Sequence, residues 1–85
     1  ELVDLEQAEG RLALEGALPG PPGVLFIPPG ERWSKTAVKY FLDLVEGINQ
    51  LPGFAPEIQG VYVQEAEDGK KHAYGYVMKK EFDKK

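Results

Sequence analysis

The chain has 85 residues, a formal net charge of −4 and 42% hydrophobic residues, which is enough for one small folded domain. It has no cysteine and one histidine, which excludes disulfides and argues against a protein-only zinc site. The acidic pI, near 4.9, argues against nucleic-acid binding, and no apolar run approaches the ~20 residues that span a bilayer. No signal peptide is visible, so we expect a cytoplasmic protein, and the start at Glu1 predicts a fragment or a processed product.

The first two predicted elements are a short helix and a strand. Asp4 is a suitable N-cap for a helix over residues 4–9, and Gly10 is a natural stop. Residues 11–18 place leucines at alternate positions, which is the period of a strand. Composition alone would also allow a helix there, but Gly16 and Pro19 favour the strand, which we predict.

Residues 18–31 hold five of the seven prolines and three of the ten glycines. They form two clusters on either side of the apolar run 24–27. Proline fixes φ and removes a backbone donor, and it pushes the preceding residue toward extended conformations. The segment therefore predicts a rigid turn, a short buried strand and a second rigid turn.

The strongest predicted helix covers residues 34–50. Ser34 is a good N-cap, and the Pro52-Gly53 pair ends the helix. Gly47 within it either allows the close approach of a strand or is tolerated slack, and we favour slack. Apolar residues at spacings of three and four give one stripe, made of Ala37, Val38, Phe41, Leu44, Val45, Ile48 and Leu51.

A β-hairpin is predicted for residues 58–78, because Asp68-Gly69 is a signal for a two-residue turn. This register sets Glu65 opposite His72, so the lone histidine meets a carboxylate at the solvated end of the hairpin. We interpret it as a structural or surface histidine and not as a catalytic one. The register places Val61, Val63, Tyr74 and Tyr76 on one face, and Tyr62, Gly75 and Val77 on the other.

Several motifs, in order, resemble one known family. The sequences LPGPPGV at 18–24 and IPPGE at 27–31 are similar to a segment near the C-terminus of the pyridoxal-phosphate-dependent ornithine/lysine/arginine decarboxylases. That segment is followed by a helix in the family, as it is here. DLEQAEGR at 4–11, PGF at 52–54 and EIQGVY at 57–62 also resemble the family, so the likeness spans nearly the whole chain.

This resemblance implies that residues 1–85 are the C-terminal accessory domain of a longer decarboxylase of ornithine, lysine or arginine. It further implies that pyridoxal phosphate is held by a large domain of the same polypeptide and that the parent is a homo-oligomer. The lysines of this chain occupy exposed hairpin positions or the polar side of the helix, without a glycine-rich phosphate cup. We therefore assign no catalytic, cofactor-binding or metal-binding residue here, and we predict that the isolated chain is inactive.

Two residues beside the proline-rich segment are candidates for a substrate entrance. Glu31 either contacts the free amides of the helix that follows or, as the resemblance implies, attracts the distal cation of a basic substrate. Trp33 either walls that entrance or anchors the domain on the large one. We favour anchoring, because exposed indoles usually mark interfaces.

The predicted fold is a single α+β domain. One long and one short helix pack on a short antiparallel or mixed sheet with a C-terminal hairpin. An alternative function is a free-standing adaptor that recruits a protein through the hairpin edge or the proline-rich turns. The sequence leaves open the choice among the three amino acids, the oligomeric state and any regulatory partner.

Overall fold

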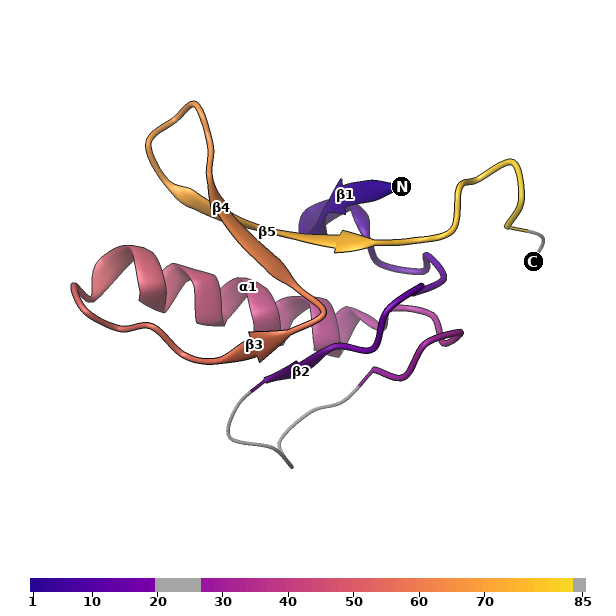
Figure 1. Ribbon diagram of the computed structural model, residues 1–85, viewed down its shortest axis with the longest axis horizontal. Coiled ribbons are helices and arrows are strands. Elements are labelled where there is room, and N and C mark those ends of the chain that lie inside the picture. Colours follow the sequence, from indigo (N-terminus) through magenta and orange to yellow (C-terminus); the bar gives the residue numbers. More distant parts are fainter. Residues whose placement is uncertain (20–26, 84–85) are drawn as a thin grey trace.

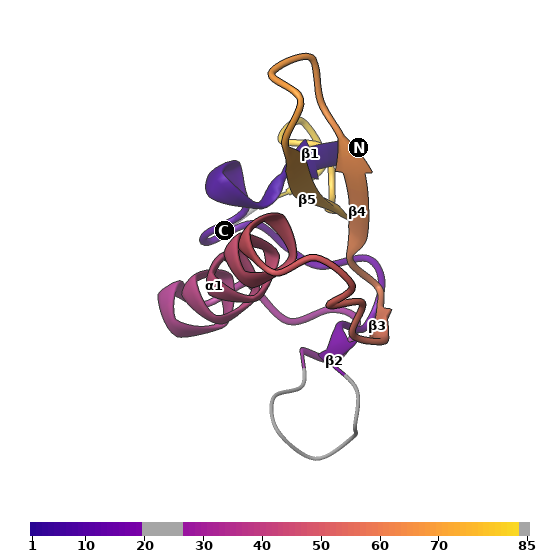
Figure 2. The ribbon, with the colours of Figure 1, turned by 90° about the vertical axis from the view of Figure 1, so that its left-hand side faces the viewer.

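An antiparallel three-stranded sheet and a long helix form the two layers of the domain (Figure 1). The computed structural model describes residues 1–19 and 27–83. The sheet has the order β1-β5-β4, with α1 across one of its faces (Figure 2), and β2 pairs with β3 in a smaller sheet. The elements are β1 (Leu2–Asp4), the 3-10 turn η1 (Leu5–Gln7), β2 (Leu18–Pro19), α1 (Lys35–Gln50), β3 (Ile58–Gln59), β4 (Tyr62–Glu65) and β5 (Lys71–Tyr76).

The predicted α+β class is confirmed, and every strand pair in the described residues is antiparallel. None of the helices in this part of the chain is long and apolar enough to cross a membrane. The predicted helix over 4–9 is reduced to the single turn η1. Asp4 caps it as expected, because its carboxylate accepts a hydrogen bond of 2.9 Å from the Glu6 amide. The strand β1 was not predicted from the sequence.

The helix α1 matches its prediction closely. Ser34 Oγ accepts a hydrogen bond of 3.1 Å from the Ala37 amide, which satisfies one of the free donors of the first turn. Its apolar stripe faces the sheet, although Leu51 at the C-cap is 57% exposed. A Cβ at Gly47 would lie 3.4 Å from the ring of Phe54, which is ordinary contact. This neighbour is a loop residue and not a strand, so close approach of a strand does not explain the glycine, and tolerated slack stays the interpretation.

The hydrophobic core lies between α1 and the inner face of β5. Trp33 meets Phe41 edge to face, with ring centroids 5.7 Å apart. Gly75 of β5 leaves room for two large side chains, because a Cβ there would already touch Leu5 and Trp33. The buried residues are Leu5, Ala8, Ala13, Ala17, Ile27, Trp33, Ala37, Val38, Phe41, Val45, Val61, Ala73 and Val77.

The predicted hairpin register is wrong by one residue. The Ala66 amide donates to the Lys70 carbonyl at 2.9 Å, and Gly69 has a φ of +80°, so the loop has three residues instead of two. A turn followed by a left-handed glycine is a common three-residue hairpin loop. Tyr74 therefore lies opposite Tyr62, and Ala73 lies opposite Val63.

A slip of one residue moves each side chain of a strand to the other face. The predicted face, which mixed valines with tyrosines, does not exist. Instead the buried positions of β5 and its extension are Ala73, Gly75 and Val77, while Tyr76 and the β4 residue Tyr62 are exposed.

The predicted strand over 11–18 is an interrupted extended segment. Leu12 bridges Arg32, Ala13 bridges Val77 and Ala17 bridges Ile27, and the regular strand β2 begins only at Leu18. Different partners along one short segment prevent a continuous ladder. Residues 20–26, which include most of the predicted strand over 24–27, lie outside the described residues. Ile27, the last residue of that prediction, is described and is buried.

Candidate functional site

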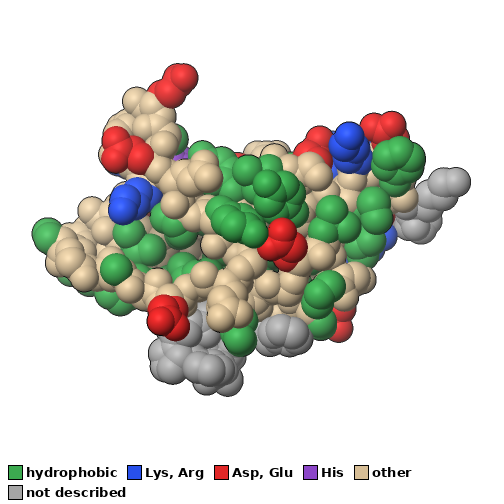
Figure 3. Space-filling model, in the orientation of Figure 1, with side chains coloured by type: hydrophobic (Ala, Val, Ile, Leu, Met, Phe, Trp, Pro, Cys, Tyr) green, Lys and Arg blue, Asp and Glu red, His purple; other side chains and the backbone are tan. Residues whose placement is uncertain are grey.

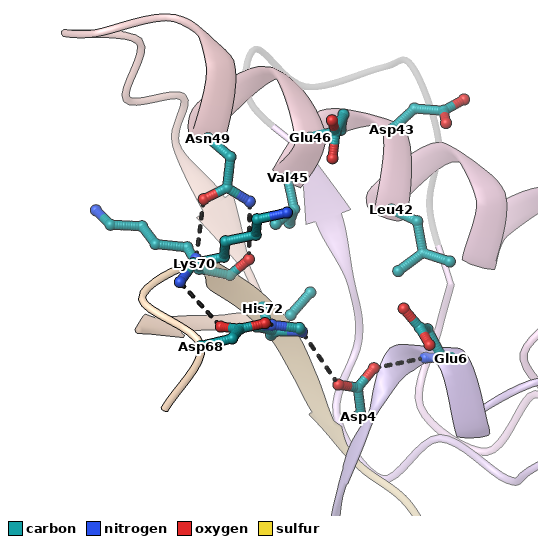
Figure 4. A pocket seen from close by; sticks show the side chains of 12 residues that line it. Asp4, Glu6, Leu42, Asp43, Val45, Glu46, Asn49, Asp68, Lys70 and His72 are labelled. Atoms are coloured by element: carbon teal, nitrogen blue, oxygen red, sulfur yellow. Dashed lines mark hydrogen bonds and ion pairs between the residues drawn. The ribbon is translucent and has the colours of Figure 1, made fainter. Parts of the chain in front are cut away.

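A surface cavity of about 430 Å³ lies between α1, η1 and the β4–β5 turn (Figure 4). It gathers acidic side chains from three separate parts of the chain, so it attracts cations. The charged and titratable residues that line it are Asp4, Glu6, Asp43, Glu46, Asp68, Lys70, Lys71 and His72.

His72 lies between two carboxylates in this cavity (Figure 4). Its Nε2 is 2.9 Å from Asp68 Oδ2, and its Nδ1 is 3.6 Å from Asp4 Oδ2. The hydrogen bond with Asp68 raises the pKa of His72 above its ordinary value. The pKa of Asp68 is lowered, first by the hydrogen bond from the Lys70 amide and then by the one from His72.

The predicted partner of His72 was therefore wrong. The corrected register sets Gln64 opposite it, and its carboxylate partners come from the turn and from β1 instead of from Glu65. The contacts join three elements, which agrees with the interpretation of this histidine as structural.

On the other side of the cavity, Asn49 links α1 to β5. Its side-chain amide donates to the Lys71 carbonyl at 2.9 Å, and its carbonyl oxygen accepts from the Lys71 amide at 2.8 Å (Figure 4). The last turn of α1 thereby holds the first residue of β5. This contact was not predicted from the sequence, although the side-chain amide of asparagine offers both a donor and an acceptor for such a link to the backbone.

These interactions define what the cavity can do. Asp43 pairs with Lys39 at 2.9 Å, and Asp4 and Asp68 are both engaged by backbone amides and by His72. In the described residues, no three His, Cys, Asp or Glu side chains form a group that could hold a metal ion. The side chains that line the cavity hold the hairpin against the helix. Among these described residues, no nucleophilic side chain is paired with a general base.

Glu31 is exposed on a segment whose backbone is fixed. Its carbonyl accepts from the Ala13 amide at 2.8 Å, and its own amide donates to the Pro28 carbonyl at 3.2 Å. The helix cap expected from Glu31 is supplied by Ser34. The carboxylate thus points from a rigid position into solvent, and its role at a substrate entrance stays a prediction.

Trp33 is a core residue, and the expectation of an exposed indole was wrong. Only 2% of its surface is accessible, and its backbone pairs on both sides, with Arg11 and Gly10. An anchoring role based on exposure therefore has no support.

Arg32, which lies between Glu31 and Trp33, was not predicted to make an ion pair. Its guanidinium binds both carboxylate oxygens of Asp83, at 2.7 and 2.9 Å.

The described residues do not fit pyridoxal phosphate. A lysine that forms a Schiff base needs a setting that lowers its pKa, usually burial or a nearby positive charge. Each described lysine is exposed, on α1, on the hairpin or after β5. No reaction step is therefore assigned to these residues.

Comparison with known proteins identifies the family. Residues 1–79 match the model described as "Orn/Lys/Arg decarboxylase, C-terminal domain". The chain belongs to this family. The resemblance of its motifs is thereby confirmed.

Two ornithine decarboxylases are similar to this decarboxylase C-terminal domain over nearly its whole length. The enzyme from Haemophilus influenzae is 67% identical over 92% of the chain, and the constitutive enzyme from Escherichia coli is 60% identical over 93%. The solved structure of the constitutive lysine decarboxylase of E. coli matches with a TM-score of 0.69, at 36% identity over 93% of the chain. The chain spans about 11% of the length of each of these proteins.

Proposed function

We propose that this domain is the C-terminal part of a longer pyridoxal-phosphate-dependent decarboxylase of basic amino acids. The observation that carries the proposal is the match of nearly the whole chain to about one tenth of much longer decarboxylases. In this proposal the reaction belongs to a large domain elsewhere in the polypeptide, where the cofactor supplies the electron sink for carbon–carbon cleavage. We further propose that the parent is cytoplasmic, and that it is a homo-oligomer, as the family resemblance implies.

Ornithine is the substrate that we propose for the parent. The domain is 60–67% identical to the two ornithine decarboxylases and 36% identical to the lysine decarboxylase. A domain that has diverged together with its enzyme should be most similar within its own substrate class. This difference in identity supports ornithine over lysine.

The domain's own contribution is to pack beside the active-site entrance and to bias the approach of substrate. Ornithine carries a distal ammonium group, and the domain has a net charge of −4. Glu31 adds a carboxylate that is exposed and held by a hydrogen-bonded backbone. Because the backbone that carries this carboxylate is already ordered, the backbone loses little conformational entropy when a cation binds.

The first test is decarboxylation by the full polypeptide. We expect carbon dioxide release from ornithine in preference to lysine and arginine, and no release by the 85-residue chain alone. A preference for lysine or arginine would reject the proposed substrate. A reading frame of about this length with its own start codon would reject the decarboxylase proposal and favour the adaptor.

The second test concerns Glu31 in the same full polypeptide. We expect E31Q to raise the KM for ornithine by about twofold at low salt with little change in kcat, and the effect to fade as salt screens the charge. E57Q is the matched control, because it removes an equal charge from another exposed position. Equal effects of the two variants would remove Glu31 from the entrance.

A further inference from the structure

The outer face of the sheet, turned away from α1, carries large apolar side chains. Leu2 is 41% exposed, Leu14 44%, Tyr62 38% and Tyr76 40%. Hydrophobic side chains gather on this side of the molecule over β4 and β5 (Figure 3). Single exposed apolar residues are ordinary, whereas a contiguous group marks an interaction site.

The four side chains come from four segments and form one group. Leu2 lies directly opposite Tyr76 in the β1–β5 pair, and the Leu14 amide donates to the Tyr76 carbonyl at 3.1 Å. The rings of Tyr62 and Tyr76 meet edge to face with centroids 5.6 Å apart. The fold thus assembles this group from residues up to 74 positions apart, with Tyr76 in contact with each of the other three segments.

One polar contact lies at the border of the group. The Tyr62 hydroxyl donates to Glu15 Oε1 at 2.6 Å, and this hydrogen bond raises the pKa of Tyr62. A carboxylate has acceptor sites for further donors. A matching surface would therefore be apolar, with an N–H donor or a basic group placed against Glu15.

The position of the first residues indicates which surface this is. The amino group of Glu1 donates to the Val77 carbonyl at 3.0 Å, and the Val77 amide donates to the Glu1 carbonyl at 2.8 Å. These bonds fix Glu1 against the end of β5, next in sequence to Leu2 and therefore at the edge of the group. The matched family is a C-terminal domain that covers about 11% of its relatives, so most of such a relative precedes the point equivalent to Glu1.

We propose that the outer face formed by Leu2, Leu14, Tyr62 and Tyr76 docks onto the catalytic body of the same polypeptide. The inference rests on the proposed function and specifies which surface of the domain makes the contact. A chain arriving at Glu1 comes in along the edge of this face, so the body can cover it without a long linker.

Oxidative footprinting of the full polypeptide by hydroxyl radicals tests the proposal. Phe54 is the internal reference, because its exposure of 39% matches those of Tyr62 and Tyr76. Each rate is divided by the rate in the urea-unfolded polypeptide, so intrinsic reactivities cancel. We expect Tyr62 and Tyr76 to be oxidised severalfold more slowly than Phe54, and equal normalised rates would overturn the proposal.

A pair of variants separates docking from general folding. In the full polypeptide L14R should restore oxidation of Tyr62 and Tyr76, whereas L51R, a matched change at an exposed leucine, should not. Restoration by both variants, or protection that falls on dilution as copies separate, would reject docking within one polypeptide. Carbon dioxide release from ornithine by the same samples reports on the proposed function separately. An active enzyme in which Tyr62 and Tyr76 are not protected would overturn the proposed docking surface and leave the proposed function standing.

Discussion

The two sides of β5 differ in the size of their side chains. Toward α1 the strand and its extension present Ala73, Gly75 and Val77, which are buried. The alternate positions hold His72, Tyr74 and Tyr76, which remain partly or largely accessible. The inner side chains are small because large side chains from other elements fill the space beside them. The outer side chains are large, although no layer of the described residues covers them.

This difference separates stability from association. Inner residues determine whether the domain folds, since the core is closed by their contacts. Outer tyrosines add little to the core, so their size is better explained by a surface that covers them. Substitutions on the two sides should therefore differ in both magnitude and readout.

The largest expected effect is in the core. F41A should lower the free energy of unfolding by about 3–5 kcal/mol, because it removes a fully buried ring that contacts Trp33 and leaves a cavity. Urea unfolding followed by circular dichroism measures the loss. L51A, at a leucine that is 57% exposed, should cost under about 1 kcal/mol. Similar losses for the two variants would contradict the assigned core.

The size limit of the inner side gives the next prediction. A Cβ at Gly75 would lie 3.7 Å from Leu5 and 3.8 Å from Trp33, which is ordinary contact. G75A should therefore fit, whereas G75V should overpack the core and cost about 1–3 kcal/mol. Thermal unfolding of both variants measures the difference. A valine variant as stable as the alanine variant would show that the inner side has spare room.

The outer side should respond more weakly in the 85-residue chain. Y76S loses an edge-to-face ring contact at a side chain that is 40% exposed, so we expect a cost of about 0.5–1.5 kcal/mol. Urea unfolding under the conditions used for F41A gives the comparison. If Y76S were as costly as F41A, the outer side would belong to the core and the contrast between the sides would fail.

The smallest expected effect is a pH dependence at the hairpin end of β5. The pKa of His72 is raised in the fold, so its stabilisation is complete below its unfolded value of about 6.5 and is lost as pH rises through the raised value. The lowered pKa of Asp68 acts oppositely: its contribution is present above about 3.9 and is lost as pH falls. The contact is therefore strongest between these limits.

Urea midpoints measured at about pH 6 and about pH 8 test this direction. The midpoint should fall at the higher pH, and H72Q should remove most of that fall. The other groups that face His72 are Asp4 at the end of β1, Glu6 in η1, Asp43 and Glu46 on α1, and Lys70 and Lys71 on the hairpin. The same pH dependence in H72Q would show that His72 is not its source.

Local signals were sufficient for α1 and for the family. The helix is specified by a cap at Ser34 and by a long period of apolar residues, both of which act within a few residues. The ordered motifs from residue 4 to residue 62 identified the decarboxylase domain. For both the helix and the family, the residues that decide the outcome are close together in the sequence, so their pattern can be recognised without the structure.

The missed features depend on contacts between distant segments. The hairpin register turned on whether Gly69 is the last of two or of three loop residues, since a left-handed glycine fits both. Trp33 is buried only because α1 and β5 close over it, and β1 is too short to show a period. The Arg32–Asp83 pair joins residues 51 positions apart, a distance over which spacing predicts nothing.

The antiparallel placement of β1 on β5 has a mechanical consequence. Glu1 lies beside Val77, so tension applied ahead of Glu1 and resisted beyond β5 acts on neighbouring points. The hydrogen bonds between β1 and β5 then break one after another, because the force loads them in sequence and not all at once. Peeling should stop at Leu5, whose buried side chain ties the start of η1 into the core. The first few residues would therefore extend under low force while the remainder of the domain keeps its shape.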